Sequence, residues 1–274
     1  MPLQEVSSDA HADVAADASP PEPDFVSFDG VSFGYGDGDA FLPVVDDVSF
    51  TASRGSFTAF VGPSGCGKTT ILNIIAGLSR PTAGTVTLRS SSRKFRVAYM
   101  LARDALLPWR SAQKNVELPM ELAGVARAER KARAARLLDQ VGLAGFEKKR
   151  PVELSHGMKQ RVALARTLAQ DPDVLLMDEP FSALDAQTRT IVQRLFLEIW
   201  ERERRTVFFV THDLSEALAL ADRVFVLSAR PTRIRKVVTP DLPRPRHIAA
   251  LRHDETYNAL YDDLWSTLET EAQQ

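Results

Sequence analysis

The chain contains 274 residues, which is enough to bury the core of one large domain or of a domain with a subdomain. Hydrophobic residues (44%) and charged residues (26%) occur in the proportions of an ordinary soluble globular protein, and the formal net charge of −2 argues against a global basic field for nucleic acid. The single cysteine, Cys66, excludes an intrachain disulfide and fits an intracellular location.

The first 24 residues are rich in Ala, Asp, Ser and Pro and contain no Lys or Arg. They also lack an apolar centre, so we expect a disordered acidic tail over 1–24 and no secretion signal. No run in the sequence approaches the ~18 apolar residues of a membrane-spanning helix. The chain is therefore not expected to cross a membrane by itself.

Residues 25–100 have the alternation and turn residues of a strand-rich region. The predicted strands are 25–28, 31–33, 44–50, 57–61, 84–88 and 97–100, with a turn-rich loop at 34–39. The strand at 57–61 leads into a glycine-rich loop, and a short helix over 70–76, ended by Gly77, leaves it.

The loop fits the phosphate-binding pattern GxxxxGK[ST]. Its glycines allow backbone N–H groups to close around phosphate oxygens, and the helix N-terminus adds a partial positive charge. We expect Lys68 to reach the β- and γ-phosphates and the Thr69 hydroxyl to ligate Mg²⁺. Modification of the Cys66 thiol is then expected to block nucleotide binding. The predicted nucleotide-binding residues are Gly62, Pro63, Ser64, Gly65, Cys66, Gly67, Lys68, Thr69 and Thr70.

Helical periodicity dominates from about 112 to 169 and includes a basic amphipathic helix over 126–141. The basic residues of that helix are interpreted as a solvated face, with a nucleic-acid patch as the alternative. The interval between the glycine-rich loop and residue 178 is mostly helical. A helical subdomain at about 102–170, inserted into the nucleotide-binding core, is the simplest explanation.

Strands and helices alternate in the second half of the chain, which predicts an α/β layered core. The predicted elements are a buried strand at 174–177, a helix at 188–204, a strand at 207–210, a helix at 214–221 and a strand at 224–227. Asp178 and Glu179 follow the buried strand. At this position Asp178 is suited to hold Mg²⁺ and Glu179 to polarise the attacking water as general base.

Four further segments occur in a characteristic order around these motifs. Ser155 is a predicted N-cap in Leu-Ser-His-Gly-Met-Lys-Gln-Arg at 154–161. Together with the phosphate loop, this segment resembles the signature of ABC transporter ATPases. Residues 182–185, which end in Asp185, resemble the family's D-loop, and His212 resembles its switch histidine. Tyr35 matches the aromatic residue that stacks on adenine.

The resemblance covers roughly residues 25–227 and implies a P-loop NTPase fold. This fold has a RecA-like core, an antiparallel β-subdomain and an inserted α-helical subdomain, here within 25–240, followed by a helical extension at 241–274. It also implies ATP and Mg²⁺ as cofactors and a homodimer that closes on ATP. Ser155 and Gly157 would then contact the γ-phosphate bound by the partner cassette.

Two departures from the family pattern affect the expected site. In the signature, His156 and Met158 replace the usual glycine and glutamine. Ala102 occupies the position of the Q-loop glutamine, and alanine offers no metal ligand. Either water or a neighbour such as Asp104 takes the place of the glutamine beside Mg²⁺, or the sensing role of the Q-loop is weaker in this chain. We still expect hydrolysis of MgATP.

Leu-Leu-Pro-Trp-Arg at 106–110 resembles a segment of ATPases that serve nitrate, sulfonate and taurine importers. In related transporters this region receives a helix of the membrane permease, and Trp and Arg are favoured interface anchors. The alternative is that the segment packs the helical subdomain. The C-terminal helix carries an apolar stripe, which is predicted to pack on the core or, alternatively, to form a regulatory surface. The stripe comprises Tyr257, Leu260, Tyr261, Leu264 and Leu268.

Three functions are consistent with these patterns. The first is the ATPase of a bacterial importer for a small anion, peripheral on the cytoplasmic face of the membrane. Its partners would be permease subunits and, indirectly, an extracytoplasmic substrate-binding protein, with no role for nucleic acid. The second is the detached ATPase of an exporter. The third is a soluble non-transport ABC ATPase.

Overall fold

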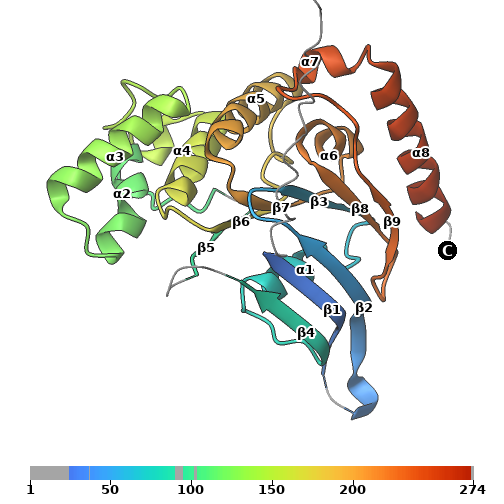
Figure 1. Ribbon diagram of the computed structural model, residues 1–274. Coiled ribbons are helices and arrows are strands. Elements are labelled where there is room, and N and C mark those ends of the chain that lie inside the picture. Colours follow the sequence, from blue (N-terminus) through green and yellow to red (C-terminus); the bar gives the residue numbers. More distant parts are fainter. Residues whose placement is uncertain (1–24, 37, 90–94, 102–103, 273–274) are drawn as a thin grey trace, which may run out of the picture.

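The computed structural model describes residues 25–36, 38–89, 95–101 and 104–272 (Figure 1). The predicted tail at 1–24 and Ala102 lie outside the described residues. Within the described part of the chain, we find no helix with the length and apolar character required to cross a bilayer.

The smaller sheet has three antiparallel strands in the order β2-β1-β4. The strands are β1 (Val26–Tyr35), β2 (Leu42–Ala52) and β4 (Ala83–Leu88). The sequence predicted two strands where β1 is continuous, because the register shifts between Phe28 and Val31 absorb the interruption. Gly30 lies in that interruption at φ 58, a left-handed conformation that suits glycine.

The larger sheet has six strands in the order β5-β6-β7-β3-β8-β9. The strands are β5 (Val97–Met100), β6 (Val174–Asp178), β7 (Thr206–Thr211), β3 (Phe57–Val61), β8 (Arg223–Leu227) and β9 (Ile234–Val238). All neighbouring strands in this sheet pair in parallel, except β8 and β9, which are antiparallel. β9, whose mixed polar and apolar residues lie at the sheet edge, was not predicted from the sequence.

Two apolar cores lie on opposite faces of the larger sheet. Alternate residues of β3 contribute to each core, since Phe57 and Ala59 belong to one and Phe60 to the other. This alternation follows from the two-residue period of a strand. The second core also contains the buried face of the small sheet, so both sheets are held around α1.

Eight α-helices occur among the described residues, and α2, α3 and α4 gather at the end of the molecule away from the small sheet (Figure 1). Two short 3₁₀ helices, Gly38–Ala40 and Pro151–Glu153, complete the described helical elements. The α-helices are α1 (Lys68–Ile75), α2 (Ala112–Leu122), α3 (Arg127–Gln140), α4 (His156–Leu168), α5 (Ala186–Glu203), α6 (Leu214–Leu220), α7 (Ile248–Leu251) and α8 (Glu255–Ala272).

The C-terminal segment is held against α6 by buried arginine and apolar contacts. The Arg246 guanidinium donates to the carbonyls of Leu218 (3.0 Å) and Ala221 (2.7 Å), which satisfies acceptors at the end of α6. The predicted stripe on α8 packs on the core, with Tyr257 and Leu264 buried and its other members partly buried.

Candidate nucleotide site

The glycine-rich loop connects the carboxyl end of β3 to α1, and two of its glycines are required by its shape. Gly65 has φ 74 and Gly67 has φ 123, both unfavourable for residues with a side chain. A Cβ atom on Gly67 would also lie 2.8 Å from Thr232 Oγ1. The loop therefore keeps a tight backbone turn at the start of α1, where N–H groups are free to meet an anion.

Lys68 brings its positive charge to the inner side of this loop. Its side chain is nearly buried, and Nζ donates to the carbonyl oxygens of Gly62 and Pro63, each at 2.8 Å. A cavity of about 260 Å³ opens beside the loop. Its lining residues are Tyr35, Val44, Ser64, Gly65, Gly67, Lys68, Thr69, Thr70, Glu179 and Arg230.

Cys66 lies inside the loop but is not accessible. It is 2% exposed, and burial raises the pKa of its thiol. The Thr232 hydroxyl donates to the Cys66 carbonyl oxygen, which ties the loop to the segment before β9. The folded protein therefore shields this thiol, because a reagent would have to reach a buried sulfur whose raised pKa disfavours the reactive thiolate. That modification of Cys66 would block nucleotide binding stays a prediction.

Tyr35 and Arg230 lie at the outer rim of the cavity. Tyr35, at the end of β1, is 52% exposed and makes an edge contact with Phe33. Arg230 Nε and Nη2 donate to the Gly65 carbonyl oxygen at 2.8 and 2.6 Å. Arg230 was not predicted from the sequence as a site residue, because it lies just after β8 and far from the loop in sequence.

Thr69, which lines the cavity, and Asp178 place two side-chain oxygen atoms next to each other. The Thr69 hydroxyl donates to Asp178 Oδ2 at 2.9 Å. Burial raises the pKa of Asp178, and the Thr69 hydrogen bond opposes that rise. One carboxylate and one hydroxyl next to a phosphate-binding loop match the few protein ligands that Mg²⁺ uses beside substrate phosphates. These residues therefore fit the predicted metal.

Glu179 and His212 come from neighbouring strand ends and meet beside this pair. His212 Nδ1 lies 3.2 Å from Glu179 Oε2. Glu179 has φ 46, and its N–H donates to the Val210 carbonyl oxygen at 2.9 Å. The Ser182 hydroxyl donates to the Glu179 carbonyl oxygen at 3.0 Å. The carboxylate is thus held in position by its backbone and lines the cavity.

Three predicted residues lie outside the cavity, at the N-termini of α4 and α5. The Ser155 side chain caps α4 by accepting from the Met158 N–H, and Asp185 caps α5 by accepting from the Thr188 N–H. Gly157 of α4 lies close against Thr188 of α5. None of Ser155, Gly157 and Asp185 lines the cavity beside the phosphate loop of the same chain. His156 is exposed, so its side chain points to solvent.

The contact between α4 and α5 predicts a strict size limit at Gly157. A Cβ atom there would lie 2.3 Å from Thr188 Cγ2. We expect Gly157→Ala to lower the free energy of unfolding by about 1–3 kcal/mol, the usual cost of overpacking. Adding Thr188→Ala should restore most of the loss in chemical denaturation, because it removes the clashing methyl group. A single Gly157→Ala variant as stable as wild type would contradict the close contact.

Comparisons with known proteins agree with this geometry. Residues 45–182 match the family model described as ABC transporter. The taurine import ATP-binding protein of Pseudomonas fluorescens is 48% identical, over 70% of this chain and 74% of that protein. The aliphatic sulfonates import ATP-binding protein of Bacillus cereus is 40% identical, over 81% of this chain and 88% of that protein. Among solved structures, the dimeric ATP-binding cassette MJ0796 bound to ADP and Pi has a TM-score of 0.68 and 30% identity. The match covers 78% of this chain and 98% of that chain.

Proposed function

The chain belongs to the ATP-hydrolysing, ATP-binding family of ABC transporters, and we propose that it is the energy-coupling ATPase of an importer for a small anion such as nitrate, a sulfonate or a taurine-like compound. The observation that carries this proposal is its extensive identity to import ATP-binding proteins for taurine and sulfonates. The proposed location is the cytoplasmic face of the membrane.

In the proposed mechanism, the phosphate loop and α1 bind the triphosphate, and Lys68 neutralises charge on its terminal oxygens. Tyr35 stacks on adenine. Thr69 and Asp178 would hold Mg²⁺, which when bound neutralises charge on the phosphates. Glu179 accepts the proton of the attacking water, and His212, at 3.2 Å, orients the carboxylate.

The second part of the proposed site comes from another copy of the chain. Ser155, Gly157 and Asp185 lie outside the cavity of their own protomer. The exposed N-terminus of α4 presents N–H groups suited to an anion. We infer that this helix end meets the γ-phosphate held by the partner, as supported by the dimeric state of the related cassette MJ0796.

Residues 106–110 offer the proposed contact with the permease. Leu106 is buried and anchors the segment, whereas Trp109 is 69% exposed. Arg166 donates to the carbonyl oxygens of Asp104 and Ala105, each at 2.7 Å, so the approach to the segment is held by α4. In this proposal Leu106 packs the segment onto the protein and Trp109 contacts the permease. An exposed Trp on a supported loop is a suitable interface anchor.

We expect Trp109→Ala to weaken binding to the permease at least about tenfold while sparing ATP hydrolysis by the isolated chain. Trp265→Ala is the matched control, because Trp265 is 54% exposed on α8. The measurement is recovery of the permease with affinity-tagged chain from detergent extracts of cells that express both. Equal recovery with Trp109→Ala and wild type would reject this docking surface.

Uptake by cells tests the importer assignment. Cells that lack this chain should lose uptake of at least one radiolabelled anion among nitrate, taurine and an alkanesulfonate. Wild-type chain should restore that uptake, and a Glu179→Gln variant should not. Normal uptake of all three with impaired efflux would instead support an exporter ATPase.

A further inference from the structure

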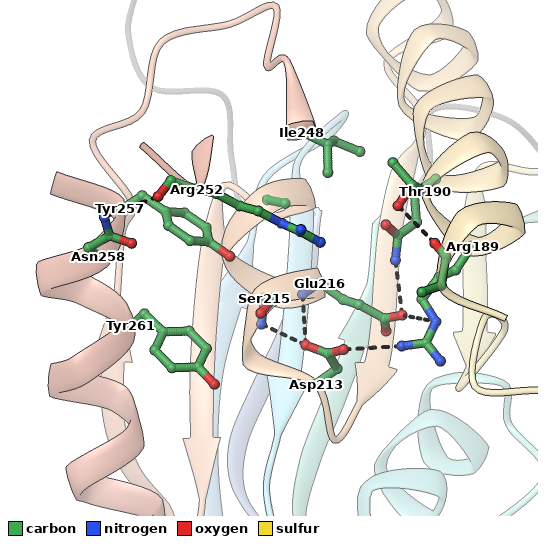
Figure 2. Close-up of a pocket in the computed structure, with 13 residues that line it drawn as sticks. Arg189, Thr190, Asp213, Ser215, Glu216, Ile248, Arg252, Tyr257, Asn258 and Tyr261 are labelled. Atoms are coloured by element: carbon green, nitrogen blue, oxygen red, sulfur yellow. Dashed lines mark hydrogen bonds and ion pairs between the residues drawn. The ribbon is translucent and has the colours of Figure 1, made fainter. Parts of the chain in front are cut away.

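A second cavity, of about 310 Å³, lies between α5, α6 and the C-terminal segment that contains α7 and α8 (Figure 2). It is separate from the nucleotide cavity, and the two share no lining residue. We propose that it binds a small oxyanion, such as a carboxylate, sulfonate or phosphate group. The proposal does not depend on the importer assignment.

The carboxylate oxygens on one wall of this cavity already accept hydrogen bonds from the protein. Glu216 Oε2 accepts from the Thr211 hydroxyl at 2.6 Å, and Oε1 accepts from Gln193 Nε2 at 2.9 Å. Asp213 Oδ1 caps α6 by accepting from the Ser215 N–H at 2.8 Å. Both carboxylates are therefore committed to the fold, which disfavours a cationic ligand.

Donor groups, by contrast, remain available to a ligand. The Arg252 guanidinium extends from the C-terminal segment into the cavity (Figure 2), and within the described ranges it has no hydrogen bond or ion pair. Arg189 also lines the cavity, but its Nε is buried and lies 3.8 Å from Glu216 Oε1 in an ion pair, so this side chain is committed to the fold. The N–H donors of Arg252 favour an oxyanion, because charge-assisted hydrogen bonds are the strong ones.

The charge balance also favours an anion. Arg189 Nη1 lies 3.4 Å from Asp213 Oδ2, so these two groups offset each other. Burial raises the pKa of Glu216 to about 7, which leaves that group largely uncharged in mildly acidic solution. The positive charge of Arg252 then stays uncompensated. Tyr257 and Ile248 line the same cavity and can contact the carbon part of an organic anion.

Binding of methanesulfonate and of inorganic phosphate to the full chain, measured by calorimetry, tests the site. We expect saturable binding that weakens at least about tenfold in Arg252→Gln. Arg194→Gln, a change at an exposed arginine of α5 paired with Glu198, should leave the affinity unchanged. The Lys68→Ala variant separates this site from the phosphate loop and should retain binding. Binding lost in Lys68→Ala but kept in Arg252→Gln, or no saturable binding to wild type, would overturn the proposal.

The pH dependence of anion affinity provides an independent test of the site. Affinity for methanesulfonate, whose own charge is constant in this range, should fall as pH rises from 6 to 8, because ionised Glu216 repels an anion. Several titratable and polar groups surround Glu216. They are Arg189 and Gln193 from α5, Thr211 at the end of β7, His212 and Asp213 from the loop that follows, and Arg252, Tyr257 and Tyr261 from the C-terminal segment. Glu216→Gln should bind the anion with a flatter pH profile. An equal fall in affinity in Glu216→Gln and wild type would contradict this arrangement.

Discussion

Replacing Glu179 with Gln is expected to slow ATP turnover by a factor of about 10²–10⁴ while ATP still binds. The amide keeps the size of the side chain but is a very poor proton acceptor. The backbone position is set by the N–H bond to Val210 and the Ser182 contact, neither of which involves the carboxylate. Steady-state phosphate release and equilibrium ATP binding measure the two effects separately.

Glu198→Gln is the matched control, because Glu198 is an exposed glutamate on α5, outside the lining of the nucleotide cavity. Its turnover should equal that of wild type. Normal turnover in Glu179→Gln would show that another group accepts the proton, and the role proposed for Glu179 would be wrong.

Replacing Lys68 with Ala is expected to weaken ATP binding by about 10- to 100-fold, as follows from losing charge-assisted hydrogen bonds. The ammonium is nearly buried and donates to the carbonyl oxygens of Gly62 and Pro63, so its charge is fixed at the inner side of the loop. Calorimetric titration with ATP measures the affinity. Circular dichroism of the same sample checks that the fold is retained.

Lys159→Ala is the control for this change, since Lys159 lies in α4 and outside the lining of the nucleotide cavity. The monomeric Lys159→Ala variant should bind ATP with the affinity of the wild-type monomer. Unchanged ATP affinity in a folded Lys68→Ala variant would contradict the assignment of this loop to the triphosphate.

Much of the site could be predicted because it depends on local rules and on sheet geometry. The phosphate loop is encoded by glycines at positions with positive φ and by the lysine that follows them. Glu179 and His212 follow adjacent parallel strands, β6 and β7, whose carboxyl ends lie at the same sheet edge. A motif at each of those strand ends is therefore sufficient to predict that Glu179 and His212 meet.

Other contacts were not predictable because they join residues far apart in the chain through lone side chains. Arg230 reaches Gly65 across 165 positions, and a single arginine before a proline carries no recognisable pattern. The closeness of Gly157 and Thr188 depends on how α4 and α5 are packed. That α8, which carries Tyr257, forms one wall of the second cavity was likewise not predictable, because the apolar stripe of this helix indicates packing and says nothing of the groups opposite.

The central claim is that ATP is enclosed between two copies of the chain, with the phosphate loop of one facing Ser155 and Gly157 of the other. Sedimentation of the Glu179→Gln variant with and without MgATP tests it most directly. We expect a monomer without nucleotide and a stable dimer with MgATP. Adding Ser155→Arg to the same chain should prevent that dimer. A Glu179→Gln chain that binds MgATP but remains monomeric would contradict the shared site.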